Sequence, residues 1–152
     1  MRNTKDRSWK TIGWVLIMIF GLSVGLIAML KNPSKAESEE HLATMNRDMD
    51  VALKIGGVVD STYSNAKFGG SLLIKNIDAH SWNPEIAKAY QLELTRRGWV
   101  QRSNDGNVVT LCKDHMLAKI NAFSEKDSSR GLPRDVYAFA MIYDARTEKE
   151  CG

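Results

Sequence analysis

An uncharged apolar stretch near the N-terminus is the strongest pattern in the chain. Residues 11–30 read TIGWVLIMIFGLSVGLIAML, with fifteen apolar side chains among twenty and no charge. Twenty helical residues extend about 30 Å, which matches the hydrocarbon core of a bilayer. A buried core helix of this length would need a larger domain around it than the rest of the chain can form. We therefore predict a transmembrane helix over residues 11–30.

The charges beside this stretch predict its orientation. Residues 1–10 carry four basic side chains, whereas only Lys31 and Lys35 follow closely after residue 30. Because basic residues favour the cytoplasmic side, we predict a single-pass signal anchor with a basic cytoplasmic flank at residues 1–10. The C-terminal part would then lie in the periplasm of a bacterium, beyond the cytoplasmic (inner) membrane. Cleavage of the anchor after Ala36 is the alternative.

Two glycines in the apolar stretch have the spacing of a helix-packing motif. Gly21 and Gly25 form a small-x-x-x-small pattern, which lets two transmembrane helices approach closely. The pattern would allow a homodimer through the transmembrane helix, although glycine is frequent in such helices in any case.

Residues 31–55 predict a helix that links the apolar stretch to the following domain. Ser34 and Glu37 have the spacing of a capping box, and Gly56-Gly57 supply a stop signal. Apolar residues recur between them at three and four positions, namely at Leu42, Met45, Met49, Ala52 and Leu53. The last turns of this helix should therefore pack on the core of the domain.

Residues 56–152 have the patterns of a small α+β domain. Asn83, Pro84 and Gly98 are typical of helix ends and predict a helix over residues 83–98, while Asp105-Gly106 favours a β-hairpin. Strands are predicted over residues 58–63, 71–77, 99–102, 108–112, 116–123 and 136–143, with an exposed loop over 124–134. We predict a two-layer domain with an antiparallel sheet and two helices.

The strand predicted over residues 136–143 differs from the others. Its residues are apolar at both sets of alternating positions, as Val136 and Ala138 alternate with Tyr137 and Phe139. A strand of this kind is buried on both faces. It should therefore be central in the sheet, with a helix on one side.

The distribution of charge argues against nucleic-acid binding. The formal net charge is +3. Residues 1–10 hold this whole surplus, so that residues 31–152 contain 17 basic and 17 acidic side chains. A balanced domain has no electrostatic attraction for a polyanion.

Few residues have a spacing that suits metal binding or catalysis. Cys112-x-x-His115 and Asp78-x-His80 could supply zinc ligands, but structural zinc sites usually show paired Cys or His motifs. Cys112 with His80 or His115 as base could be a nucleophile, yet no oxyanion-type context surrounds it. We predict no catalytic residue, no metal and no cofactor, and we expect the protein not to be an enzyme.

The two cysteines have a simpler use. In an oxidising compartment Cys112 and Cys151 can pair in only one way within the chain. The bridge would tie a polar C-terminal tail to the domain and close a loop of about forty residues. Two free thiols, or pairing between chains, are the alternatives.

Charged and aromatic residues around the helix at 83–98 have structural explanations. Arg96 and Arg97 fall in its last turn, where solvated cations interact favourably with the helix dipole. Trp82 and Trp99 bracket the helix, and we interpret them as core residues. The alternative is that residues 80–82 line a groove at the start of the helix, where anions are also favoured.

These patterns favour binding over catalysis. We expect a non-catalytic protein-binding or scaffolding domain that belongs to an envelope assembly and meets a protein partner on the non-cytoplasmic side. The alternative is an immunity or inhibitor protein that neutralises a toxin or hydrolase in the periplasm.

Overall fold

The computed structural model describes residues 13–23, 25, 32–128 and 131–152. The chain divides into two compact units, residues 1–32 and residues 33–152. In the first unit residues 13–23 are helical, and their large apolar side chains, such as those of Trp14 and Phe20, are exposed.

The prediction of a transmembrane helix over residues 11–30 is wrong. Within the part of the chain that the structure describes, no helix combines the length and the apolar character needed to cross a membrane. The helical run of residues 13–23 extends about 16 Å at 1.5 Å per residue, roughly half of a hydrocarbon core. Residues 11–12, 24 and 26–30 of the predicted span lie outside the described residues.

The predictions that depended on this span are corrected with it. We predicted an inner-membrane location, with the N-terminus in the cytoplasm and the domain in the periplasm. This location is not supported, because no helix among the described residues could span a membrane. The basic flank at residues 1–10 lies outside those residues. Gly21 and Gly25, predicted to pack a second helix, have open space where a Cβ atom would stand. The membrane anchor is therefore corrected, whereas the homodimer through Gly21 and Gly25 stays a prediction.

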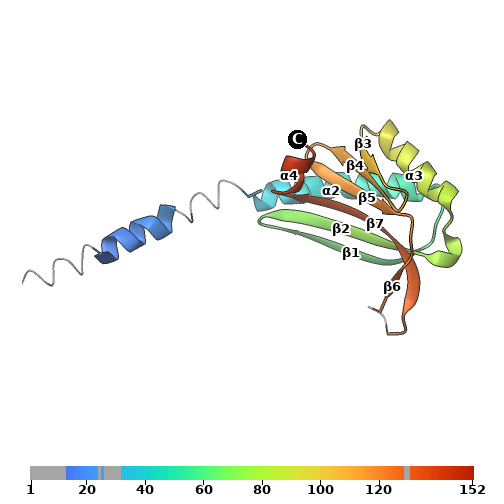
Figure 1. Ribbon diagram of the computed structural model, residues 1–152, viewed down its shortest axis with the longest axis horizontal. Helices are drawn as coiled ribbons and strands as arrows, with labels where there is room; N and C mark the ends of the chain where they lie inside the picture. Colours follow the sequence, from blue (N-terminus) through green and yellow to red (C-terminus); the bar gives the residue numbers. More distant parts are fainter. Residues whose placement is uncertain (1–12, 24, 26–31, 129–130) are drawn as a thin grey trace, which may run out of the picture. The chain divides into compact units, whose positions relative to one another are not determined.

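The second unit is an α+β structure on a seven-stranded antiparallel sheet (Figure 1). The strand order is β1-β2-β7-β5-β4-β3, and β6 pairs with β7. The bounds are β1 Val59–Lys67, β2 Gly70–Asp78, β3 Val100–Asn104, β4 Val108–Lys113, β5 Met116–Asn121, β6 Glu125–Asp127 and β7 Arg134–Asp144. The predicted central position of β7 is confirmed, since it lies between β2 and β5.

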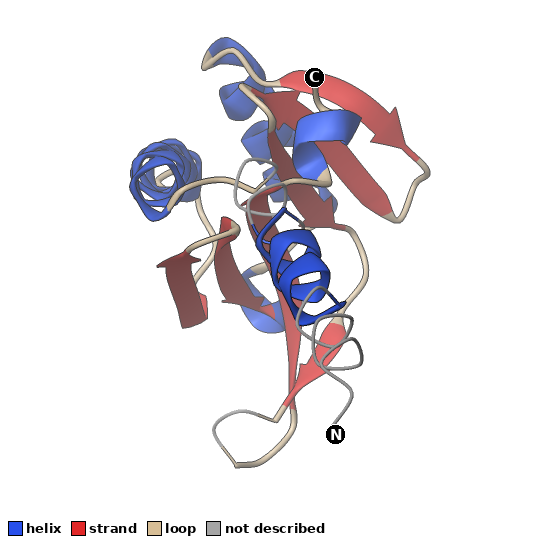
Figure 2. Cartoon of the chain, turned by 90° about the vertical axis from the view of Figure 1, so that its left-hand side faces the viewer, coloured by secondary structure: helices blue, strands red, loops and turns tan. Residues whose placement is uncertain are grey.

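Two helices, α2 (Lys35–Leu53) and α3 (Pro84–Arg96), form a layer on one face of the sheet. A short 3-10 helix, Ala79–Ser81, precedes α3, and α4 (Thr147–Glu150) follows β7. Figure 2 shows α2 nearly end-on at one side of the strands and α4 at the other side. The long helices thus cover one face, while α4 lies on the opposite face.

The ends of the two long helices follow the sequence signals. The Ser34 hydroxyl accepts from the N–H of Glu37 at 3.2 Å, while the Glu37 carboxylate accepts from the N–H of Ser34 at 2.7 Å. This is the predicted capping box. At α3 the Asn83 side chain accepts from the N–H of Ile86 at 2.9 Å, and Pro84 occupies the first helical position.

The core lies between the helix layer and the sheet. The predicted apolar stripe of α2 is confirmed, because Met45, Met49 and Ala52 are fully buried. They belong to one cluster with residues of α3, β2, β4, β5 and β7: Tyr90, Leu94, Leu73, Ile77, Leu111, Met116, Ala118, Ile120, Phe139, Met141 and Tyr143. Burial of this apolar surface is the main driving force for the fold.

Three segments differ from the sequence prediction. The predicted loop at 124–134 contains β6, a strand too short and too polar to produce an apolar alternation. The strand β1 extends to Lys67 rather than residue 63, because exposed polar side chains hide its pattern. The polar run before Cys151 forms the short helix α4. Hydrogen bonds between Asp144 and Thr147 stabilise the start of this helix.

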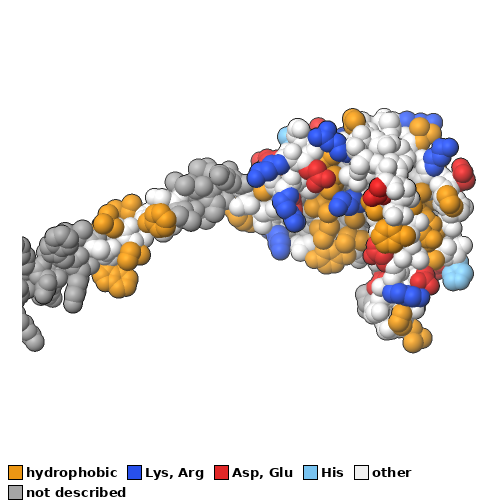
Figure 3. Space-filling model, in the orientation of Figure 1, with side chains coloured by type: hydrophobic (Ala, Val, Ile, Leu, Met, Phe, Trp, Pro, Cys, Tyr) orange, Lys and Arg blue, Asp and Glu red, His pale blue; other side chains and the backbone are white. Residues whose placement is uncertain are grey.

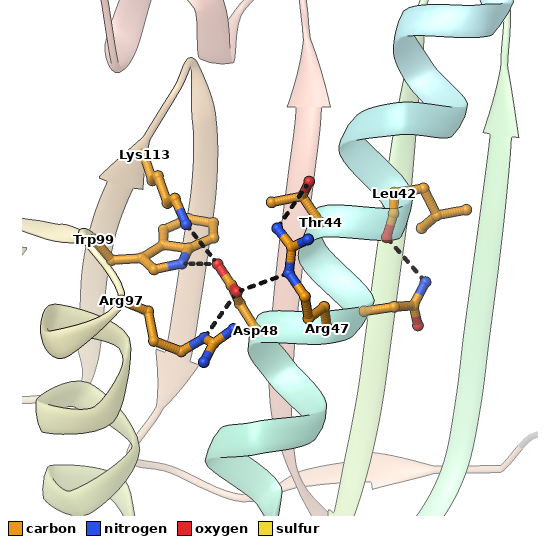
Figure 4. Close-up of polar contacts among 8 residues, drawn as sticks. Leu42, Thr44, Arg47, Asp48, Arg97, Trp99 and Lys113 are labelled. Atoms are coloured by element: carbon orange, nitrogen blue, oxygen red, sulfur yellow. Dashed lines mark hydrogen bonds and ion pairs between the residues drawn. The ribbon is translucent and has the colours of Figure 1, made fainter.

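One buried carboxylate joins the helix layer to the sheet (Figure 4). Asp48 of α2 is 1% exposed. It accepts hydrogen bonds from Arg97 Nε at 2.8 Å, Trp99 Nε1 at 2.9 Å and Lys113 Nζ at 2.8 Å. Arg47 adds an ion pair at 3.7 Å. The partners come from the end of α3, the start of β3 and the end of β4, so one side chain fixes α2 against three other segments.

These contacts keep Asp48 charged. Burial alone would raise its pKa, but hydrogen bonds from Lys113, Trp99 and Arg97 together outweigh burial and lower the pKa below that of a free aspartate. An unfolded aspartate has a pKa of about 3.9. The stabilisation from Asp48 is therefore complete above that pH and is lost as the pH falls through the lower, folded-state pKa.

We predict that Asp48→Asn lowers the free energy of unfolding by about 3 kcal/mol at pH 7, because it leaves buried cations without their counter-charge. Urea unfolding followed by tryptophan fluorescence measures this loss. The difference between wild type and variant should shrink as the pH falls below about 4. Asp50→Asn, on the same helix but at an exposed carboxylate paired with Lys75, is the control and should cost about 1 kcal/mol or less. Equal losses in the two variants would contradict a special role for Asp48.

Candidate functional site

The sheet has a second face that neither long helix covers. On β2, Leu73 and Ile77 belong to the core, so the alternate residues Leu72 and Ile74 lie on the opposite side. The same alternation applies to β7 and β5. We call this surface the open face and define it by Tyr63, Leu72, Ile74, Lys119, Ala138, Ala140 and Ile142.

The strand register arranges the open face in rows across the sheet. The first row contains, in order from β1 to β5, Tyr63, Ile74, Ala140 and Lys119. The neighbouring row contains Asn65, Leu72, Ile142 and Leu117. The centre of the open face is therefore apolar, and Lys119 lies directly beside its middle strand.

The apolar side chains of the open face remain accessible to solvent. Leu72, Ile74, Ala140 and Ile142 are half-buried, and Tyr63 is exposed. The solvated face of an antiparallel sheet usually carries polar residues, and contiguous apolar patches mark interaction sites. Figure 3 shows this side of the unit, where apolar side chains gather with Lys and Arg side chains beside them. The open face therefore has the composition that is typical of an interaction surface.

The C-terminal segment forms one boundary of the open face. A disulfide joins Cys112 of β4 to Cys151, with Cα atoms 5.3 Å apart, as the sequence predicts for this pair. Both cysteines are thereby bonded, and neither is free. The bridge holds α4 against β5 and β7, where Leu117 is only 2% exposed.

The opposite boundary is the hairpin of β6 and β7, which projects below the sheet in Figure 1. The Asp127 carboxylate of β6 accepts from the Ser61 hydroxyl at 3.0 Å and from Asn76 Nδ2 at 3.1 Å. Ser61 and Asn76 lie next to each other on β1 and β2. These contacts tie the hairpin to the edge of the open face.

A pocket of about 310 Å³ opens at the α4 end of the open face. Its lining includes Tyr63, Phe68, Leu72, Ile142 and Arg146. The Arg146 guanidinium donates to the carboxylate of a neighbouring aspartate, at residue 144, at 3.0 Å. Aromatic and apolar walls with a guanidinium at the rim are suited to an apolar side chain of a partner.

A second depression lies on the other side of the molecule, between α3 and the β3–β4 hairpin. It consists of cavities of about 550 Å³ and 480 Å³, both lined in part by Lys88 and Gln91. Trp82 lines one of them, but His80 lines neither. The Gln91 side chain donates to Gln101 across this depression at 2.5 Å.

The sequence-derived metal ligands do not converge. Cys112 is oxidised in the disulfide, and His115 lies in an exposed turn after it. Asp78 and His80 contact each other, with Nδ1 and Oδ1 3.0 Å apart, at the end of β2. Among the described residues no group of three or more His, Cys, Asp or Glu side chains could hold a metal ion. The disulfide also removes the thiol that a Cys112 nucleophile would need.

The residues around α3 divide between two roles. Trp99 is buried, as predicted, and Trp82 stacks on Tyr137 with ring centroids 4.9 Å apart. The interpretation of Arg97 as a solvated cation is wrong, because it binds the buried Asp48. Arg96 is exposed and pairs with a glutamate one turn earlier on α3.

The open face contains functional candidates that the sequence analysis missed. Lys119 was not singled out because it is a polar position in a mostly apolar strand, and Ala140 was not singled out because it is one of several apolar positions of β7. The sequence signal for the open face was the apolar character of β7 at both sets of alternating positions. Helices of this domain could cover only one face of that strand, which leaves the other face accessible.

Comparison of the chain with protein families, curated proteins and solved structures gives no match. We therefore infer the function from the geometry of the open face.

We predict that the disulfide is needed for the α4 boundary. Replacing both cysteines, Cys112→Ala with Cys151→Ala, should lower the free energy of unfolding by about 4 kcal/mol by the chain-entropy estimate. Hydrogen exchange should speed up over residues 146–152 and at Leu117, while β1 and β2 keep their protection. Addition of a reductant should cause the same faster hydrogen exchange in the wild type and should have no further effect on the variant. Undiminished protection of α4 in the variant would contradict the prediction.

Proposed function

We propose that the protein is a non-catalytic protein-binding domain and that the open face is its binding surface. The observation that supports this proposal is the solvent-accessible apolar floor on the central strands β2 and β7. Contact with water at such a patch is unfavourable, and a partner that covers it gains the free energy of burial.

The polar groups around this floor suit recognition better than chemistry. The Asp127 carboxylate is occupied by Ser61 and Asn76, and the carboxylate of Asp144 is occupied by Arg146 and by backbone N–H groups. Burial would raise the pKa of Asp144, but these hydrogen bonds outweigh burial and lower it. The Asp144 carboxylate is thus not poised as a general base near neutral pH.

Photo-crosslinking at single positions tests the proposal. We expect p-benzoylphenylalanine in place of Tyr63 to give a discrete protein adduct in the cells that make this protein. The same residue in place of Leu92 on α3 should give none, although Tyr63 and Leu92 are both 52% exposed. The adduct's identity separates the scaffolding role from inhibition, because an inhibitor would capture a single toxin or hydrolase.

A substitution that blocks the open face provides a second test of the proposed function. Ala140→Arg places a large charged side chain at the centre of the open face and should abolish the adduct at Tyr63. Its melting temperature should stay within a few degrees of the wild type, since the side chain points away from the core. Thr95→Arg, at an exposed position of α3, should leave the adduct unchanged. Failure to form an adduct at Tyr63, or an equal adduct at Leu92, would contradict the proposed function.

A further inference from the structure

Lys119 is an unusual residue at the centre of the open face. It lies on β5, one strand from the middle of the sheet, and is exposed. Its neighbours in the row are Thr110 on β4 and Ala140 on β7, and neither carries a charge. Among the described residues Lys119 has no ion pair or side-chain hydrogen bond. The ammonium group therefore stands beside an apolar floor without an internal partner.

The nearby acidic groups do not neutralise Lys119. Asp127 is bound by Ser61 and Asn76, and Asp144 is bound by Arg146. The glutamates of α4 belong to the boundary of the open face and make no ion pair with Lys119. Lys67, at the end of β1, is a second exposed cation that has no ion pair in the described chain. Glu125 of β6 makes no ion pair with Lys119, and its carboxylate accepts a hydrogen bond from Asn121 Nδ2 at 2.5 Å. Lys119 and Lys67 therefore present positive charge beside the apolar floor, and a complementary partner carries negative charge there.

The form of the partner segment follows from hydrogen bonding. The backbone groups of β2, β7 and β5 are already paired with neighbouring strands on both sides. An extended segment laid on this face would bury backbone N–H and C=O groups without partners, which is costly. A helix satisfies its own backbone and buries only side chains, as α2 does on the opposite face. A helix is therefore the suitable occupant.

The dimensions of the open face agree with a short helix. From Ala138 to Ile142 the accessible part of β7 covers four residue steps, or roughly 13 Å at 3.3 Å per residue. A helix covers the same distance with about nine residues at 1.5 Å each. The small side chains of Ala138 and Ala140 leave room above the middle of the sheet for larger side chains of the helix.

Symmetric pairing of two open faces is unfavourable. It would bring two Lys119 side chains, one from each copy, into a common apolar interface. Burial of like charges without a counter-charge costs several kcal/mol. A second copy of this chain is therefore a poor occupant.

We propose that the open face binds an amphipathic helix of a partner protein, and that an Asp or Glu beside the apolar stripe of that helix pairs with Lys119. This inference rests on the proposed function. It assigns Lys119 as the residue that selects the partner by charge, while the apolar floor supplies most of the affinity.

Two synthetic helical peptides test the pairing. Both carry the same stripe of Leu and Ala, and they differ only in bearing Glu or Lys beside the stripe. With the full-length oxidised chain, fluorescence anisotropy should show about tenfold tighter binding of the Glu peptide. Lys119→Glu should reverse this preference. Lys88→Glu, which makes the same charge change at an exposed position of α3, should leave the preference unchanged.

The outcomes separate this inference from the proposed function. Equal binding of both peptides, abolished by Ala140→Arg, would overturn the role of Lys119 and leave the open face as a binding surface. Binding that Ala140→Arg does not affect would contradict the proposed function itself. A persistent adduct at Tyr63 without binding of either peptide would overturn the helical partner. Dimerisation in sedimentation velocity that Ala140→Arg abolishes would assign the open face to a second copy instead.

Discussion

The burial of one charge constrains the whole folded unit. Asp48 is fully enclosed, so its carboxylate must be matched by donors, and these come from three separate parts of the chain. Satisfying it requires α2, the end of α3 and the end of β4 to occupy fixed positions together. The apolar core around Met45 and Phe139 supplies most of the stability, while the carboxylate restricts how the layers align. Both helices are thereby committed to the same face of the sheet.

Because both long helices pack on one face of the sheet, the apolar side chains of the other face remain accessible to solvent. A two-layer fold buries one side of its sheet, and the central strands here are apolar on both sides. The disulfide and α4 cover one end of the exposed side, and the β6–β7 hairpin limits the other end. A partner helix between these boundaries would complete a three-layer arrangement in which β7 is buried on both faces. In this respect binding would resemble a last step of folding.

The sequence predicted local features better than their assembly. The capping box at Ser34, the start of α3 at Pro84 and the central position of β7 depend on nearby residues or on a single strand, and each was recognisable. The Asp48 cluster was not, because its partners at residues 97, 99 and 113 meet only through tertiary packing. The strand β6 was missed because three polar residues produce no apolar alternation. For the open face, the pattern of β7 predicted apolarity but not which side would stay uncovered. The apolar composition of residues 11–30 suggested a membrane helix, which the described helix does not provide.

The antiparallel pairing of the sheet separates two kinds of mutational constraint. Successive residues of β7 alternate between a packed interior and an accessible surface, so neighbouring positions have different structural roles. A change at Phe139 or Met141 disturbs packing that the whole domain shares. Under the proposed function, a change at Ala138 or Ala140 would alter the shape or charge presented to a partner and would leave the backbone pairing intact. New binding preferences could therefore evolve, or be engineered, by substitutions at alternate positions while the stability of the domain stays nearly constant.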